Sequence, residues 1–205
     1  MLRKDQTEVL VVGAGPVGMV TALLLAESGV KVKIIDQESR TAAHSYACAL
    51  HPRTLKLLDQ LRLADDVLLL GRRIDTIGFY EGESKRAEMK FSELPADFPF
   101  LVVLTQNALE GLLEQKLTQH ESVTVGWNHR LTELRSMSDA VIATIDKLGQ
   151  SAKGYIIPEM DWEVMKTLQT QAAFVVGADG HDSHVRQCLR TILTSSPQVA
   201  SDSNS

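Results

Sequence analysis

Three glycines and an aspartate near the start of the chain have the types and the spacing needed to hold a phosphate ester. Gly13, Gly15 and Gly18 form a G-x-G-x-x-G pattern. In this pattern the first glycine allows a tight turn, the second lets the backbone approach a pyrophosphate, and the third lets a helix pack closely. Asp36 follows at a distance close to the roughly 20 residues expected for a carboxylate that binds a ribose. These residues predict a dinucleotide site.

A strand, a turn and a helix must position these residues, and the surrounding sequence predicts each of them. The apolar run Val9 to Val12 predicts a short buried strand, a helix is expected to begin near Pro16, and Gly29 is expected to end it. Residues 30–35 predict a second strand, with Asp36 at its end. Phosphate would then lie on the helix dipole, next to Pro16. A buried strand and helix joined by glycines, without a ligand, is the alternative.

Two other interpretations of the apolar stretch 9–29 are disfavoured. A secretory signal is disfavoured because Asp5, Glu8 and Glu27 interrupt or close the stretch. A membrane-spanning helix is disfavoured because three glycines and a proline fall in its middle, where each would weaken or break the helix. We therefore expect a cytoplasmic protein without a membrane span.

The composition is that of an ordinary globular protein. Of 205 residues, 44% are hydrophobic and 23% are charged, and the formal net charge is -5. This charge gives no electrostatic reason to expect a nucleic acid or an anionic membrane as a partner. Cys48 and Cys188 do not form a close pair and are expected to be free thiols. His181 and His184 lack a third nearby ligand, so no metal site is expected.

The opening unit does not distinguish NAD from FAD, because both carry the ADP group that it would hold. Three further segments carry more information: SYACALHPRTLKLL at 45–58, LVVLTQNALEGLL at 101–113 and FVVGADGHDSHVRQCL at 174–189. Together with GAGPVG and Asp36, these segments resemble the group A flavin monooxygenases, the FAD-dependent aromatic hydroxylases related to p-hydroxybenzoate hydroxylase. The resemblance extends roughly from Thr7 to Leu193.

The resemblance implies further cofactor-binding residues. In the family, the acidic residue of a G-A-D-G motif lies near the FAD pyrophosphate, which implies this position for Asp179 and Gly180. The resemblance also places Gln106 close to the flavin and gives Arg53 a reach toward phosphate or ribose oxygens. From the residues alone, Asp179 could instead bind backbone amides at a turn, Gln106 could begin a surface helix, and Arg53 could be an exposed cation. Tyr46 stands where many relatives carry an arginine, which puts one cofactor contact in question.

The whole pattern predicts the α/β class, with a Rossmann-like FAD-binding fold of the glutathione-reductase type and an incomplete β-rich substrate region. Residues 1–193 are expected to form a monooxygenase-like FAD-binding domain in which 72–100 begin the substrate-side sheet, and residues 194–205 to form a disordered tail. A G-D-A-x-H-type flavin segment, present in the family, is missing, so the fold is expected to be truncated. A hairpin is predicted around EGESK, and short strands over 123–127, 130–134, 140–146 and 172–176.

The activity that the resemblance implies is the hydroxylation of a small aromatic or related organic substrate, with FAD as cofactor and NAD(P)H as reductant. No catalytic side chain can be assigned from the sequence. A non-catalytic FAD- or dinucleotide-binding module is the alternative, because the closing flavin segment is missing. An NAD-dependent dehydrogenase is disfavoured by the presence of both G-A-G-P-V-G and G-A-D-G.

Overall fold

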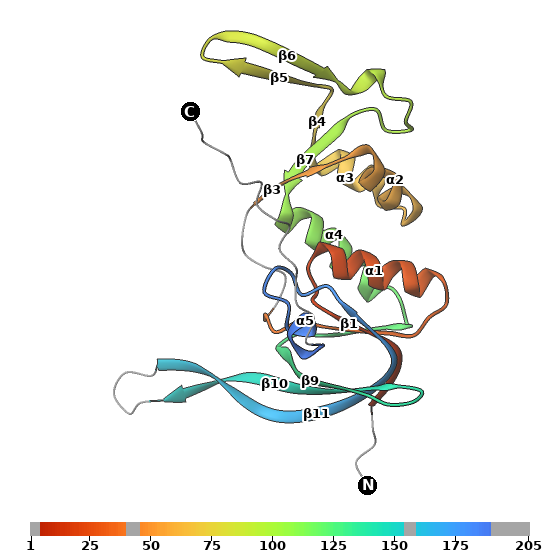
Figure 1. The fold of residues 1–205 in the computed structure, drawn as a ribbon, viewed down its shortest axis with the longest axis vertical. Helices are drawn as coiled ribbons and strands as arrows, with labels where there is room; N and C mark the ends of the chain where they lie inside the picture. Colours follow the sequence, from red (N-terminus) through yellow and green to blue (C-terminus); the bar gives the residue numbers. More distant parts are fainter. Residues whose placement is uncertain (1–4, 40–45, 154–158, 190–205) are drawn as a thin grey trace, which may run out of the picture.

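A six-stranded sheet with parallel strands at its centre positions the glycine turn (Figure 1). The computed structural model describes residues 5–39, 46–153 and 159–189. The strands of this sheet are β1 (Asp5–Val12), β2 (Val32–Ile35), β8 (Val123–Gly126), β9 (His129–Ser136), β10 (Val141–Lys153) and β11 (Glu159–Gly177). Their order is β8-β2-β1-β11-β10-β9. The first four run parallel to one another, whereas β10 and β9 are antiparallel additions.

Strand β1 lies inside this sheet and is buried on both faces. The described helices are α1 (Pro16–Glu27), α2 (Pro52–Gln60), α3 (Ala64–Leu70), α4 (Gln106–Thr118) and α5 (His184–Cys188). Val9 and Val11 pack into the core that includes α1 and α4, whereas Leu10 and Val12 pack on the opposite face with Val185 of α5. Because successive strand residues point to opposite faces, burial of both faces requires an unbroken apolar run. The predicted strand, turn, helix and second strand are confirmed.

A second, smaller sheet leads into the helix that begins at Gln106. It is antiparallel, has the order β3-β7-β4, and consists of β3 (Ala47–Leu50), β7 (Leu101–Thr105) and β4 (Arg72–Ile74). The chain passes from β7 directly into α4, where the Thr105 hydroxyl accepts a hydrogen bond from the Ala108 N–H at 3.3 Å. Such a cap satisfies one of the free N–H groups at a helix start.

The region expected to begin a substrate-side sheet divides into two parts in the structure. Strand β4 pairs with β7, whereas β5 (Thr76–Glu81) and β6 (Ser84–Lys90) pair with each other in a separate hairpin. The hairpin extends away from the six-stranded sheet, and the 3-10 helix η1 (Phe91–Glu93) follows it (Figure 1). The predicted hairpin around EGESK is therefore confirmed.

Strands β10 and β11 form a longer hairpin than the sequence indicated. The predicted strands 140–146 and 172–176 correspond to only part of it, because β10 continues to Lys153 and β11 begins at Glu159. The extension carries exposed side chains, and Trp162 and Val164 are 51% and 48% exposed. A strand without a buried face shows no regular alternation of apolar and polar residues, so periodicity does not reveal it.

The predicted tail, 194–205, lies outside the described residues. Within the described ranges, the helices are all too short or too polar to span a membrane.

Candidate functional site

The ends of three neighbouring strands surround a cavity of about 320 Å³. Gly13 follows β1, Asp36 follows β2, and Asp179 and Gly180 follow β11, and all four residues line the cavity. They meet because β1 lies between β2 and β11 in the sheet. Open α/β sheets bind ligands at the carboxyl ends of such strands. The fold therefore joins the two motifs that lie near opposite ends of the sequence.

The glycine turn packs directly against the turn that follows β11. Gly13 has a φ angle of +103°, and a Cβ atom at this position would lie 2.3 Å from the Ala178 carbonyl oxygen. A Cβ atom at Gly18 would lie 1.9 Å from the Gly13 carbonyl oxygen. Both clashes involve backbone atoms, which cannot rotate away as a side chain can. The turn therefore requires glycine at both positions.

Gly15 has a different environment, because it faces open space. A Cβ atom at Gly15 would have no neighbouring atom within 4 Å, and the residue lines the cavity. Gly15 is also the N-cap of α1, without a side-chain cap and without an acidic residue in the first turn. Pro16 follows at the first helical position, where its missing N–H is least costly. The free N–H groups of this helix start fit a pyrophosphate, because they combine donors with the positive end of the helix dipole.

Asp36 connects the end of β2 to the glycine turn. Its Oδ2 accepts a hydrogen bond from the Ala14 N–H at 2.6 Å, and its Oδ1 accepts one from the Glu38 N–H at 2.9 Å. These bonds fix the carboxylate at the cavity wall. Each oxygen of an ionised carboxylate can accept more than one hydrogen bond, so the side chain can still bind hydroxyl groups. The ribose contact of Asp36 stays a prediction.

Asp179 caps the N-terminus of α5. Its Oδ2 accepts hydrogen bonds from the N–H groups of His184 and Val185 at 2.6 and 3.0 Å, and its Oδ1 accepts one from the Ser183 hydroxyl at 2.6 Å. Burial raises the pKa of Asp179, but its hydrogen bonds to Ser183 and to backbone amides together hold that pKa below the usual value of 3.8. The carboxylate therefore binds backbone amides, which is the alternative that the sequence left open, and a contact with pyrophosphate stays a prediction.

Strand β9 contributes a wall of the cavity that sequence reasoning missed. His129, Arg130 and Leu131 line the cavity together with Glu38. The turn before β9 is tied to the end of β2, because the Asn128 N–H donates to the Glu38 carbonyl at 2.9 Å and the His129 N–H donates to the Asp36 carbonyl at 2.7 Å. No motif marks these residues, and only the pairing of distant strands brings them to the cavity.

Arg130 is held on this wall by the neighbouring strand. Its guanidinium lies 3.5 Å from Oδ2 of Asp146 on β10. The Oδ1 atom of Asp146 accepts a second hydrogen bond, from the Thr167 hydroxyl on β11 at 2.7 Å. The planar cation of Arg130 is therefore positioned beside the cavity and remains partly exposed to it.

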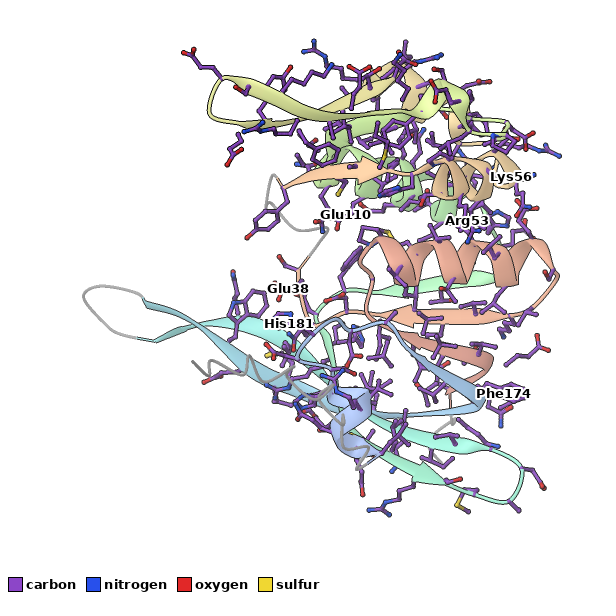
Figure 2. The ribbon with its side chains drawn as sticks, turned by 45° about the horizontal axis from the view of Figure 1, so that its top comes forward. Glu38, Arg53, Lys56, Glu110, Phe174 and His181 are labelled. Atoms are coloured by element: carbon purple, nitrogen blue, oxygen red, sulfur yellow. The ribbon has the colours of Figure 1, made fainter. Side chains whose placement is uncertain are left out.

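Arg53 and Gln106 lie outside this cavity, in the second layer of the structure, which consists of the smaller sheet β3-β7-β4 and the helices that follow its strands. Gln106 begins α4 after β7, and Arg53 lies in the first turn of α2 after β3, where it is exposed (Figure 2). Strands β3 and β7 are antiparallel, so the two residues follow opposite ends of the same ladder. The two residues are therefore apart from each other and outside the cavity at the glycine turn, and their cofactor contacts stay predictions.

Both cysteines are free thiols, as the sequence indicated. Burial and the negative charge of Glu110 raise the pKa of Cys48. Its thiol is therefore protonated at neutral pH and poorly suited to act as a nucleophile. The described part of the chain contains no group of histidine, cysteine, aspartate and glutamate side chains that could hold a metal ion.

Parallel strands, a glycine turn and an uncapped helix start beside a fixed carboxylate define a Rossmann-like dinucleotide-binding protein. Comparison with known families narrows this class, because the family described as FAD binding domain matches residues 6–202. The chain belongs to this family. The α/β fold, the resemblance to FAD-dependent aromatic monooxygenases and the prediction of FAD as cofactor are confirmed.

Related proteins are monooxygenases that are longer than this chain. The chain is 32% identical over 187 residues to 6-methylpretetramide 4-monooxygenase of Streptomyces rimosus, covering 90% of the chain and 30% of that protein. It is 30% identical over 182 residues to para-nitrophenol 4-monooxygenase of Pseudomonas sp. strain WBC-3, covering 87% and 41%. The crystal structure of p-nitrophenol 4-monooxygenase from Pseudomonas putida DLL-E4 superposes with a TM-score of 0.79 at 27% identity, covering 90% and 44%. The chain thus spans less than half the length of these relatives.

Proposed function

We propose that this chain supplies the FAD-binding region of an NAD(P)H-dependent flavin monooxygenase. The observation that carries the proposal is the open space at Gly15, at the start of an uncapped helix and in a cavity bounded by three strand ends. A bound FAD would supply the redox chemistry, with NAD(P)H as reductant. The substrate class that we propose is a small aromatic compound, because related proteins are named as monooxygenases of para-nitrophenol and pentachlorophenol.

Each part of the cavity has a distinct task in this proposal. The backbone at Gly15 and the start of α1 bind the pyrophosphate, and Asp36 accepts hydrogen bonds from the ribose hydroxyls. Asp179 is an anion and would repel the pyrophosphate, so we assign it the task of fixing the turn that carries Gly180. Gly180 has a φ angle of +77° and open space around it, so the backbone there can approach a ligand closely.

Gln106 and Arg53 are assigned to the remaining part of the cofactor. Both lie on helices that directly follow strands of the smaller sheet, β3 and β7, and neither lines the cavity at the glycine turn. A dinucleotide is elongated, so residues in two layers can bind its two ends. In this arrangement the six-stranded sheet holds the ADP half, and the second layer contributes to binding of the flavin half.

The proposal is tested by the absorption spectrum of the purified chain after FAD is added and free cofactor is removed by desalting. We expect flavin absorption to remain with the protein at close to one FAD per chain. NAD(P)H oxidation stimulated by a nitrophenol or chlorophenol then tests the activity. A folded but colourless chain would contradict the assignment of FAD binding to these residues alone, and oxidation at the rate of the buffer would contradict the enzymatic part.

Replacement of Arg130 with alanine is expected to weaken the binding of ADP and of FAD by about tenfold, because a planar cation on the cavity wall can stack on the adenine ring. Lysine at this position keeps the charge but not the plane, and it should restore little of the affinity. Arg135 is a matched control, since it lies on the same strand, pairs with Glu133 and does not line the cavity. Titration calorimetry with ADP measures both variants, and equal affinities for R130A and R135A would contradict the contact.

A further inference from the structure

Glu110 is a buried carboxylate that the cavity and its strand ends do not explain. It lies on α4, one turn after Gln106, and is 2% exposed. Its Oε1 accepts a hydrogen bond from Nε2 of Gln106 at 2.7 Å. Its Oε2 is also buried and has no hydrogen-bond partner among the described residues. Figure 2 shows Glu110 between the layer that contains β3 and the layer of α1.

Such a side chain does not favour folding. A buried polar atom without a partner costs free energy, and a buried charge costs more unless it is fully paired. The neighbouring positions on the same face of α4, Leu109, Leu113 and Leu117, are apolar and buried. A leucine at position 110 would extend this apolar face at no desolvation cost. The carboxylate therefore requires an explanation other than stability.

The bond from Gln106 to Glu110 determines the orientation of the Gln106 amide. Nε2 of Gln106 is the donor of this bond, so the amide NH₂ group faces Glu110 and the amide carbonyl oxygen faces away from it. The backbone of Gln106 is fixed as well, because its N–H donates to the Tyr46 carbonyl at 2.7 Å. Gln106 therefore presents a hydrogen-bond acceptor in one defined direction.

Strand β3, next to the strand that leads into α4, carries a further polar side chain, the thiol of Cys48. Cys48 lies on β3, which pairs with β7 immediately before α4. Burial, and after it the charge of Glu110, raise the pKa of the Cys48 thiol. Glu110 and Gln106 are hydrogen-bonded where β7 passes into α4, and Oε2 of Glu110 is an acceptor there that lacks a donor among the described residues.

We propose that Glu110 is a positioning residue that holds the carbonyl oxygen of Gln106 toward a hydrogen-bond donor of the bound flavin half, a ring N–H or a ribityl hydroxyl. This inference rests on the proposed function, since it assigns the second layer to the flavin half. Glu110 itself acts through Gln106. The unsatisfied buried oxygen is the stability cost of keeping a carboxylate at this position.

The test compares four variants of the full chain: E110L, E110Q, Q106L and the double variant E110L/Q106L. Two quantities are measured for each, the dissociation constant for FAD and the melting temperature without FAD. E114Q is the matched control, because Glu114 lies one turn further along α4 and is more exposed than Glu110. We expect E110L to bind FAD about tenfold more weakly, with a melting temperature equal to or above that of the unmodified chain.

The double variant distinguishes positioning from a general structural role. If Glu110 acts through Gln106, the double variant binds FAD no more weakly than Q106L alone, because the second substitution removes nothing further. E110Q should bind FAD with intermediate affinity, since a neutral amide can still accept from Gln106 but no longer imposes one orientation. If E110L does not fold, E110Q still tests the proposal, because glutamine has nearly the same shape as the glutamate that it replaces.

Two results would overturn the inference while leaving the proposed function intact. The first is an affinity of E110L or E110Q for FAD equal to that of the unmodified chain. The second is a double variant in which the losses of E110L and Q106L multiply, which would mean that the two residues act independently. The unmodified chain is measured in the same titration. If it does not bind FAD, the proposed function fails, and this inference fails with it.

Discussion

Valine in place of Gly15 is expected to abolish the retention of FAD while the chain still folds. The Cβ position of Gly15 is open, and its backbone has a φ angle of -74°, which any residue adopts. The fold therefore tolerates a side chain here, but that side chain occupies the space where the backbone must approach the pyrophosphate. We expect the affinity for FAD to fall by more than about a hundredfold, which corresponds to about 2.7 kcal/mol.

Two measurements check this result. Circular dichroism of the variant without FAD should match that of the unmodified chain, and flavin absorption should be lost on desalting. Val17→Ala is a suitable control, because Val17 lies in the same helix turn and is 71% exposed. A G15V chain that keeps FAD with unchanged affinity would contradict the assignment of the pyrophosphate to this turn.

Alanine in place of Gly13 is expected to destabilise the fold itself. The residue has a φ angle that side chains rarely adopt, and a Cβ atom would overlap the Ala178 backbone at 2.3 Å. Relief of this overlap requires the turn after β1 to move away from the turn after β11. We expect the free energy of unfolding to fall by more than about 3 kcal/mol, since backbone strain and a steric clash act together.

Urea denaturation of the chain without FAD measures this loss. Gly29→Ala is the control, because Gly29 also has a positive φ angle, +80°, but a Cβ atom there would meet no neighbour within 4 Å. The control should lose only the cost of the backbone conformation, about 1 kcal/mol. Equal losses for G13A and G29A would show that the contact between the two turns contributes little to stability.

The two glycine variants together separate folding from binding at one turn. G15V should leave a folded chain without cofactor, whereas G13A should leave little folded chain. This difference arises because Gly13 faces protein backbone and Gly15 faces the cavity. A general sensitivity of the turn to side chains would instead give both variants the same phenotype.

Local patterns in the sequence were sufficient for the elements around the glycine turn. The unbroken apolar run of β1, the proline at the first position of α1 and the glycine after its end each act within a few residues, so they can be read without the fold. The helix start at Gln106, one of the alternatives that the residues alone left open, depends on a local pattern in the same way. The extension of β10 and β11 was missed because exposed strands form through pairing and not through a local pattern.

The sequence by itself determined that this chain carries a dinucleotide-binding unit, because the glycine spacing, the helix start and Asp36 act over short distances. It also indicated the FAD-binding family through motifs that need no spatial context. Only the tertiary structure decided which residues share the cavity, since the pairing of β1 with β11 and the antiparallel addition of β9 bring together Gly13, Asp179 and Arg130. The structure also separated Arg53 from Gln106 and left an oxygen of Glu110 without a partner among the described residues, because burial and pairing depend on contacts between distant segments.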